Sequence, residues 1–143
     1  LNETDLDAIL LAGRLTLLDR EAEDQLVGRC REKGTSLVLG GIFNSGILAT
    51  GPVEGAWFDY APAPAEILAK VTALKEQAET LELPLASAAL HFAHSYPGVA
   101  SVLLGTSKAS SLKRNLDCLA EAPPASFSRV FGTPAQEGLQ ANL

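Results

Sequence analysis

The sequence lacks methionine altogether, and its first residue is leucine. Because a complete translation product normally begins with methionine, we expect these 143 residues to be a piece of a longer chain or a processed one. No run of about 18 apolar residues occurs, so neither a transmembrane helix nor a membrane partner is predicted. The N-terminus shows no basic segment followed by an apolar run and a cleavage site, so no signal peptide is predicted and a cytoplasmic location is expected.

Positive charge is scarce as well. The sequence has 17 acidic and 11 basic residues and a formal net charge of −6. A protein that binds nucleic acid usually carries an excess of cations to meet the phosphates, so nucleic acid is an unfavoured partner. Apolar residues make up 47% of the sequence, which supplies enough hydrophobic surface for a core and argues against disorder.

Residues that could hold a metal are few. The two cysteines, Cys30 and Cys118, are too few for a disulfide framework or a zinc cluster, and the helical apolar pattern around each predicts a reduced core thiol. His91 and His94 lie three apart on an expected helix without a third ligand nearby, so we expect them to pack or to face solvent. We therefore predict no metal site and, because no recognisable catalytic set is present, no catalytic residue.

The apolar residues alternate between two patterns. Short apolar runs at 6–13, 36–42 and 99–104 predict buried parallel strands. Residues 49–64, rich in proline and aromatic residues, are predicted to form a loop. Apolar residues at helical spacing predict helices over 19–33, 67–81, 84–96 and 112–119.

This order of elements predicts an α/β fold built from βαβ units with a parallel sheet. Three parallel strands leave both sheet edges open, whereas eight close into a barrel. We therefore interpret residues 1–121 as the C-terminal portion of a (β/α)₈ TIM barrel, with about three parallel strands and their flanking helices. Residues 122–143 are rich in proline, serine, glycine and glutamine and are expected to form a divergent surface tail.

Two turns that follow predicted strands carry groups suited to an anionic ligand. Residues 103–115 run from a strand through a glycine turn with two hydroxyls into a helix that carries several cations, which favours phosphate binding. A plain capped helix with solvated cations is the alternative. Residues 40–48 contain three glycines beside Asn44 and Ser45, which allow a ligand to approach the backbone closely. A glycine-rich turn without a ligand is the alternative there.

The aromatic loop at residues 57–60 is the third candidate. Its clustered rings suit stacking on a sugar or a flat ring. The alternative is that these rings cover the mouth of the barrel or its core. Four segments, at 12–19, 38–51, 58–64 and 99–115, contain the two turns and residues 58–60 of this loop.

In these four segments the sequence resembles the aldo-keto reductases, and within them the aldose dehydrogenases. The resemblance covers about residues 6 to 120. It implies a (β/α)₈ barrel that binds a nicotinamide dinucleotide in an extended form, with strands six to eight present here. The family's Asp, Tyr, Lys and His tetrad lies on earlier strands and has no counterpart in this sequence.

The resemblance also implies roles for residues at the strand ends. The turn after the seventh strand would hold the pyrophosphate, and the turn after the eighth would meet the ribose, its phosphate region and the adenine. The implied cofactor-binding residues are Gly41, Phe43, Asn44, Ser45, Gly105, Thr106, Ser107, Ser111, Arg114 and Asn115, and the implied substrate-pocket residues are Trp57 and Tyr60.

The cofactor preference implied by the resemblance is NAD rather than NADP. Ser111 stands where members that prefer NADP place an arginine, the natural partner of a 2′-phosphate. Lys108 and Arg114 can compensate for that absence, so both cofactors stay open. The implied activity is oxidation of a small sugar at its anomeric carbon to a lactone, or reduction of a small aldehyde. The alternative is a truncated, inactive barrel remnant that acts as a binding or interaction module.

Overall fold

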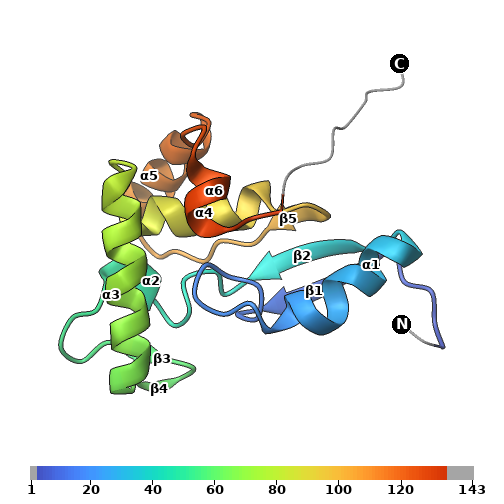
Figure 1. The fold of residues 1–143 in the computed structure, drawn as a ribbon, viewed down its shortest axis with the longest axis horizontal. Helices are drawn as coiled ribbons and strands as arrows, with labels where there is room; N and C mark the ends of the chain where they lie inside the picture. Colours follow the sequence, from blue (N-terminus) through green and yellow to red (C-terminus); the bar gives the residue numbers. More distant parts are fainter. Residues whose placement is uncertain (1–2, 135–143) are drawn as a thin grey trace.

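The computed structural model describes residues 3–134, and its centre is a parallel sheet. The strands β1 (Ala8–Ala12), β2 (Ser36–Gly40) and β5 (Val99–Val102) lie in the order β1–β2–β5, with both pairs parallel (Figure 1). Leu10 lies opposite Val38, and Val38 lies opposite Ser101. The three predicted strands are therefore confirmed as parallel neighbours. Their carboxyl ends lie at the same edge of the sheet.

Helices connect the strands and cover one face of the sheet. The chain after β1 forms a π-helical turn, η1, that continues into α1 and ends at Gly34, whose φ is 68°. The helix α4 contacts α2, α3, α5 and β5, so it forms the centre of the helical layer. The helical elements are η1 (Glu23–Val27), α1 (Gly28–Lys33), α2 (Ile47–Thr50), α3 (Ala65–Thr80), α4 (Leu85–Ser95), α5 (Ala109–Leu119) and α6 (Phe127–Phe131).

Four short elements were not predicted from the sequence. The expected loop at 49–64 contains a two-stranded antiparallel hairpin of β3 (Trp57–Phe58) and β4 (Ala61–Pro62). The helices α2 and α6 have 4 and 5 residues. Elements this short do not complete two helical turns or several strand alternations, so they leave no periodic pattern in the sequence.

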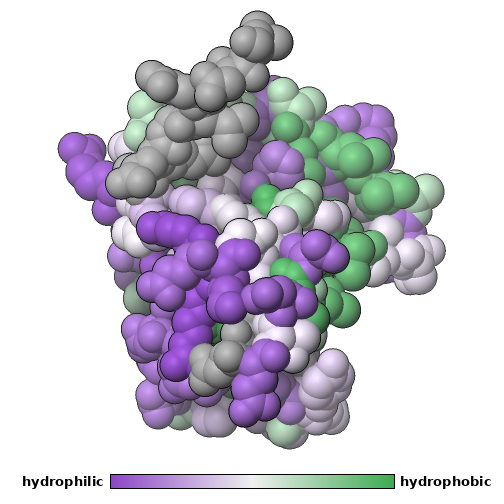
Figure 2. All heavy atoms as spheres, turned by 90° about the vertical axis from the view of Figure 1, so that its right-hand side faces the viewer, coloured by the Kyte–Doolittle hydropathy of each residue, from purple (hydrophilic) through white to green (hydrophobic). Residues whose placement is uncertain are grey.

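The two faces of the sheet differ in their burial. Leu37 and Leu39 of β2 are each only 1% exposed, because they point towards the helices. On the opposite face, Leu10 is 60% exposed and Leu103, directly after β5, is 52% exposed. Figure 2 shows hydrophobic residues reaching the surface along its right-hand side. One face of the sheet is therefore packed and the other is open.

The segment after α5 contributes to the core. Phe127 and Phe131 of α6 are buried, and their rings pack 4.9 Å apart between centroids. This part of the expected surface tail is therefore anchored on the helical layer, while residues 135–143 of that tail lie outside the described residues. Within residues 3–134, no helix is both long and apolar enough to cross a membrane.

Candidate functional site

A cavity of about 680 Å³ opens where the turn after β2 meets the segment after β5. The carboxyl ends of parallel strands are where α/β folds place ligands. Ten of the twelve predicted site residues line it: Gly41, Phe43, Asn44, Ser45, Tyr60, Gly105, Thr106, Ser111, Arg114 and Asn115. Ser107 and Trp57 are not part of the lining, so their predicted contacts stay predictions.

The start of α4 and one face of α5 complete the cavity, and the contribution of α4 was not predicted from the sequence. Pro84, Ala86, Ser87 and Leu90 come from α4 and the residue before it. Small apolar residues such as these carry no chemical motif. The proline before this helix indicated where α4 begins, but no residue indicated that its first turn would face the cavity.

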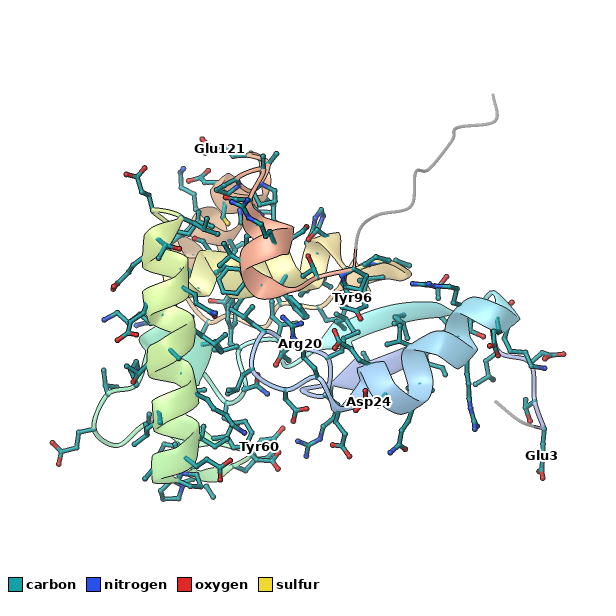
Figure 3. All side chains as sticks on the ribbon, in the orientation of Figure 1. Glu3, Arg20, Asp24, Tyr60, Tyr96 and Glu121 are labelled. Carbon is teal, nitrogen blue, oxygen red and sulfur yellow. The ribbon has the colours of Figure 1, made fainter. Side chains whose placement is uncertain are left out.

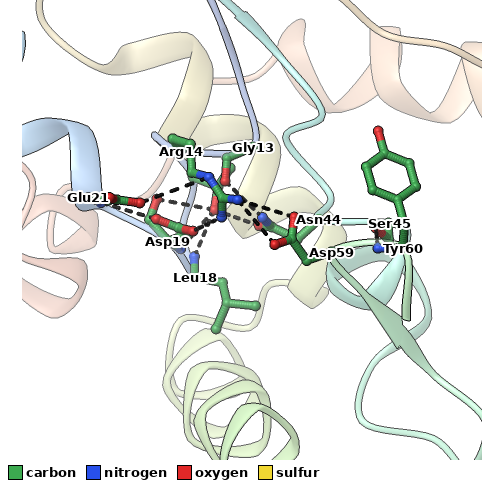
Figure 4. Close-up of polar contacts among 10 residues, drawn as sticks. Gly13, Arg14, Leu18, Asp19, Glu21, Asn44, Ser45, Asp59 and Tyr60 are labelled. Carbon is green, nitrogen blue, oxygen red and sulfur yellow. Dashed lines mark hydrogen bonds and ion pairs between the residues drawn. The ribbon is translucent and has the colours of Figure 1, made fainter. Parts of the chain in front are cut away.

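Asn44 shapes the turn after β2. It is only 6% exposed and has a φ of 46°, a conformation that asparagine tolerates better than most residues. Its Nδ2 donates to the carbonyl oxygen of Gly13 at 3.1 Å, and its Oδ1 accepts from the Thr16 hydroxyl at 2.6 Å (Figure 4). The side-chain amide is thus occupied by the loop after β1, and Asn44 acts on the cavity by positioning the turn.

The same turn brings the backbone of Gly41 close to that of Gly13. Gly41 has a φ of 60°, and a Cβ atom built there would lie 3.2 Å from the backbone nitrogen of Gly13. A side chain at this position would therefore strain the backbone and press on the neighbouring loop. Among residues 3–134 no acceptor is found for the backbone N–H groups of Phe43 and Ser45. The amide of Asn44 between them donates to the Gly41 carbonyl at 3.0 Å, so Phe43 and Ser45 each offer one separate backbone donor to an anionic ligand.

A cluster around Arg14 holds the hairpin beside the cavity. The guanidinium lies 2.8 Å from Asp19, 3.1 Å from Asp59 and 3.9 Å from Glu21. Hydrogen bonds to Asp19 and Asp59 raise the pKa of Arg14 further above its ordinary value. The exposed carboxylates of Asp59 and Glu21 supply little stability individually, but together with the part-buried Asp19 and the hydrogen bonds they fix the hairpin to the loop after β1.

Tyr60 lies at the end of that hairpin. Its backbone N–H donates to the Ser45 hydroxyl at 3.2 Å, and its φ is 63°. The side chain is 89% exposed, and Figure 3 shows it apart from the packed centre where Arg20 and Tyr96 lie. The Tyr60 ring is therefore placed at the rim of the cavity and is free to contact a ligand.

The opposite wall is the start of α5. The Thr106 hydroxyl accepts from the backbone N–H of Lys108 at 3.1 Å, which fixes the turn into the helix. Arg114 donates to the Ser111 hydroxyl at 3.4 Å. Within residues 3–134 Arg114 forms no ion pair, and it is the sole charged side chain in the lining.

The electrostatics of the cavity favour an anion. Arg114 contributes a positive charge, and the described lining contains no carboxylate. Ala86 and Ser87 belong to the first turn of α4, and Ser111 to the first turn of α5, so the positive ends of two helix dipoles lie at the walls. This local balance contrasts with the net charge of −6 for the whole chain.

The sequence comparisons decide the family. Residues 1–130 match the model of the Aldo/keto reductase family. The chain belongs to that family. It is 38% identical over 139 residues to pyridoxal 4-dehydrogenase from Microbacterium luteolum, covering 97% of this chain and 40% of that protein. It is 32% identical over 139 residues to D-threo-aldose 1-dehydrogenase from a Pseudomonas species, covering 92% of this chain and 42% of that protein.

Solved structures give the same fold. The holo form of aldo-keto reductase AKR11C1 from Bacillus halodurans superposes with a TM-score of 0.71 at 24% identity, covering 97% of this chain and 45% of that chain. The apo form gives 0.68 at 23% identity, covering 97% and 47%. The predicted resemblance and the predicted barrel portion are confirmed. This aldo-keto reductase chain spans less than half the length of the relatives it matches.

Aldo-keto reductases are oxidoreductases that use nicotinamide cofactors, and the cavity suits such a group. A dinucleotide brings two phosphates and an adenosine, which require cationic or N–H partners and an apolar slot. The lining contains Arg114, the apolar residues Leu90 and Leu104, and the two residues Phe43 and Ser45, whose backbone amides have no acceptor among residues 3–134. The residues present therefore fit the phosphate and adenosine end of the cofactor.

Two titratable residues lie at the edge of the site. His91 of α4 is 5% exposed, and its Nε2 lies 3.4 Å from Sγ of Cys118, which lines the cavity. Burial, with a smaller contribution from His94, lowers the pKa of His91. Cys30 is buried as predicted, whereas Cys118 is half-buried at the cavity wall. Within residues 3–134, no three His, Cys, Asp or Glu side chains group in a way that could hold a metal ion.

Proposed function

We propose that this chain forms the part of an aldo-keto reductase that holds the pyrophosphate and adenosine of NAD or NADP. The observation that carries the proposal is the cavity in which the two predicted turns meet, with Arg114 as its sole charged lining residue among those described. The turn at 41–46 would hold the pyrophosphate through backbone N–H groups. Gly105 and Thr106 would contact the ribose, and Asn115 the adenine.

The activity proposed for the whole enzyme is oxidation of an aldose at its anomeric carbon to a lactone. The similarity to a pyridoxal and an aldose dehydrogenase supports a small polar substrate. When bound, the nicotinamide supplies the hydride acceptor. This chain's contribution is to hold the cofactor from one side, with Tyr60 at the rim and Trp57 on the adjoining hairpin bordering the sugar. Reduction of a small aldehyde is the same chemistry in reverse.

A titration of fragments of the cofactor tests this proposal. ADP-ribose contains the pyrophosphate and adenosine and lacks nicotinamide, whereas nicotinamide mononucleotide lacks the adenosine. Calorimetry is expected to show ADP-ribose binding in the micromolar range and no binding of the mononucleotide. Absence of ADP-ribose binding by a folded protein would contradict the proposal. That result would favour a non-catalytic binding module, for which the open face around Leu10 and Leu103 offers a surface.

Gly105→Val is expected to weaken cofactor binding without unfolding the protein. No atom lies within 4 Å of a Cβ built on Gly105, so the added side chain fits the protein and occupies cavity space. We expect about a tenfold loss of NAD affinity, or about 1.4 kcal/mol. The loss is measured by calorimetry, with Gly28→Ala on α1 as a control of unchanged affinity. Equal dissociation constants for Gly105→Val and the parent protein would remove this turn from the site.

Ser111→Arg is expected to raise the affinity for NADP relative to NAD. Ser111 lines the cavity beside Arg114, so a second guanidinium there would offer bidentate hydrogen bonds to a 2′-phosphate. We expect the ratio of the two dissociation constants to shift by about tenfold. Ser110→Arg adds the same charge outside the lining and should leave the ratio near its original value. An unmoved ratio for Ser111→Arg would show that the 2′-phosphate is bound elsewhere.

A further inference from the structure

Cys118 and His91 form a thiol–imidazole pair at the cavity wall. The sulfur of Cys118 on α5 lies 3.4 Å from Nε2 of His91 on α4, within the range of a hydrogen bond to sulfur. The half-buried thiol lines the cavity, and the imidazole lies behind it with 5% of its surface exposed. A molecule in the cavity can therefore reach the thiol without passing the imidazole.

The surroundings of His91 keep its ring neutral and fixed. Its ring packs edge-on against Phe127, with centroids 6.0 Å apart and planes at 71°. Burial lowers the pKa of His91, so the imidazole is neutral near pH 7, and in the tautomer that carries its proton on Nδ1 the Nε2 atom accepts from the thiol. Proton transfer from a thiol to a neighbouring imidazole is how proteins activate cysteine as a nucleophile.

Cys30 provides the contrast within the same chain. It is 2% exposed on α1, and no hydrogen bond joins its thiol to another described residue. Burial raises the pKa of Cys30, so a smaller fraction of this thiol is ionised at neutral pH than for an exposed cysteine. The chain therefore contains one thiol that is accessible and paired with a base, and one that is neither.

We propose that Cys118 is a covalent modification site for small soft electrophiles of the α,β-unsaturated carbonyl class, with His91 as the proton acceptor. The sulfur attacks the β-carbon, an S–C bond forms, and the carbon–carbon double bond becomes single. The thiol proton passes to Nε2 of His91, and the imidazolium then gives that proton, directly or through water, to the α-carbon of the resulting enolate. His91 returns to its neutral form, so the addition needs no oxidant or further reactant.

The adduct changes what the cavity can hold. Cys118 lies in the lining with Asn115 and Arg114 of the same helix, so a group attached to its sulfur occupies space between the walls. Modification is expected to exclude an anionic ligand from this end of the cavity. The reactivity itself does not depend on the identity of that ligand, so it is tested separately from the proposed cofactor.

Labelling of the full-length protein with N-ethylmaleimide, followed by peptide mass spectrometry, tests the proposal. Cys118 is expected to react at least about tenfold faster than Cys30 at neutral pH. It is also expected to react faster than the same cysteine in a free peptide of residues 109–119, which has no histidine. A Cys118 rate at or below that of the peptide would overturn the proposal.

His91→Gln isolates the base. Glutamine can accept a hydrogen bond but cannot take up the proton, so labelling of Cys118 is expected to slow about tenfold while Cys30 keeps its rate. His94→Gln on the exposed side of α4 is the matched control and should change neither rate. An unchanged Cys118 rate in His91→Gln would also overturn the proposal. If Cys30 reacts faster in His91→Gln, the variant has partly unfolded. The rate of Cys118 in the parent protein against that of the free peptide then decides whether the proposal holds.

Discussion

Replacing Asn44 by alanine is expected to lower the free energy of unfolding by about 3 kcal/mol. The change removes the hydrogen bonds to the Gly13 carbonyl and the Thr16 hydroxyl, and it leaves the buried hydroxyl of Thr16 without this acceptor and the part-buried carbonyl of Gly13 without this donor. It also places alanine at a φ of 46°, where asparagine is better tolerated. Urea unfolding followed by circular dichroism measures the loss.

Two matched variants separate the causes. Asn44→Asp keeps an oxygen that accepts from Thr16 and loses the donor to Gly13, so its stability should lie between those of alanine and the parent. Asn115→Ala removes an amide that also lines the cavity but makes no hydrogen bond with another described residue, and it should cost less than about 0.5 kcal/mol. A loss in Asn44→Ala no larger than in Asn115→Ala would show that the two hydrogen bonds do not hold the turn.

Phe92→Ala is expected to be more damaging, with a loss of about 4 kcal/mol. Phe92 lies in α4 and is fully buried, so its truncation leaves a cavity in the helical layer. The Arg20 guanidinium lies 4.5 Å from the centroid of its ring and donates to the carbonyl oxygens of Phe131 and Gly132. Loss of the ring therefore loosens both the core and the attachment of α6.

The measurement again is unfolding by urea, with Phe92→Leu as the control that retains most of the volume. The leucine variant is expected to lose about 1.5 kcal/mol or less. Thermal unfolding should rank the two variants in the same order. Similar stabilities of Phe92→Ala and the parent protein would mean that α4 is not the centre of the fold.

The sequence predicted the strands and helices that are long enough to show a run or a periodic spacing of apolar residues. Leu37 and Leu39 lie within an uninterrupted apolar run, and a run of that kind predicts a buried strand whatever surrounds it. The apolar side chains of α4 recur at helical spacing, so that helix was also predictable. The hairpin at Trp57–Pro62 depends instead on the ion pair between Arg14 and Asp59, which forms only when distant segments meet. Its two-residue turn has positive φ angles at Asp59 and Tyr60, and neither residue type signals that turn as glycine would.

The candidate site divides in a similar way. The two turns were predictable because glycines and hydroxyls directly follow strands, and both turns do line one cavity. The positioning role of Asn44 was not, because its partners Gly13 and Thr16 lie about thirty residues away and carry no motif. The pairing of Cys118 with His91 was missed for the same reason, since the two residues are 27 positions apart on different helices.

The loop after β1 governs a pocket that it never touches. None of residues 13–19 lines the cavity, yet Gly13 and Thr16 hold Asn44, and Arg14 holds Asp59 beside Tyr60. A substitution in this loop would shift the turn of Asn44 and the hairpin of Tyr60 together without changing the identity of any lining residue. Laboratory evolution for altered ligand preference should therefore recover changes in residues 13–19 as well as in the residues that line the cavity.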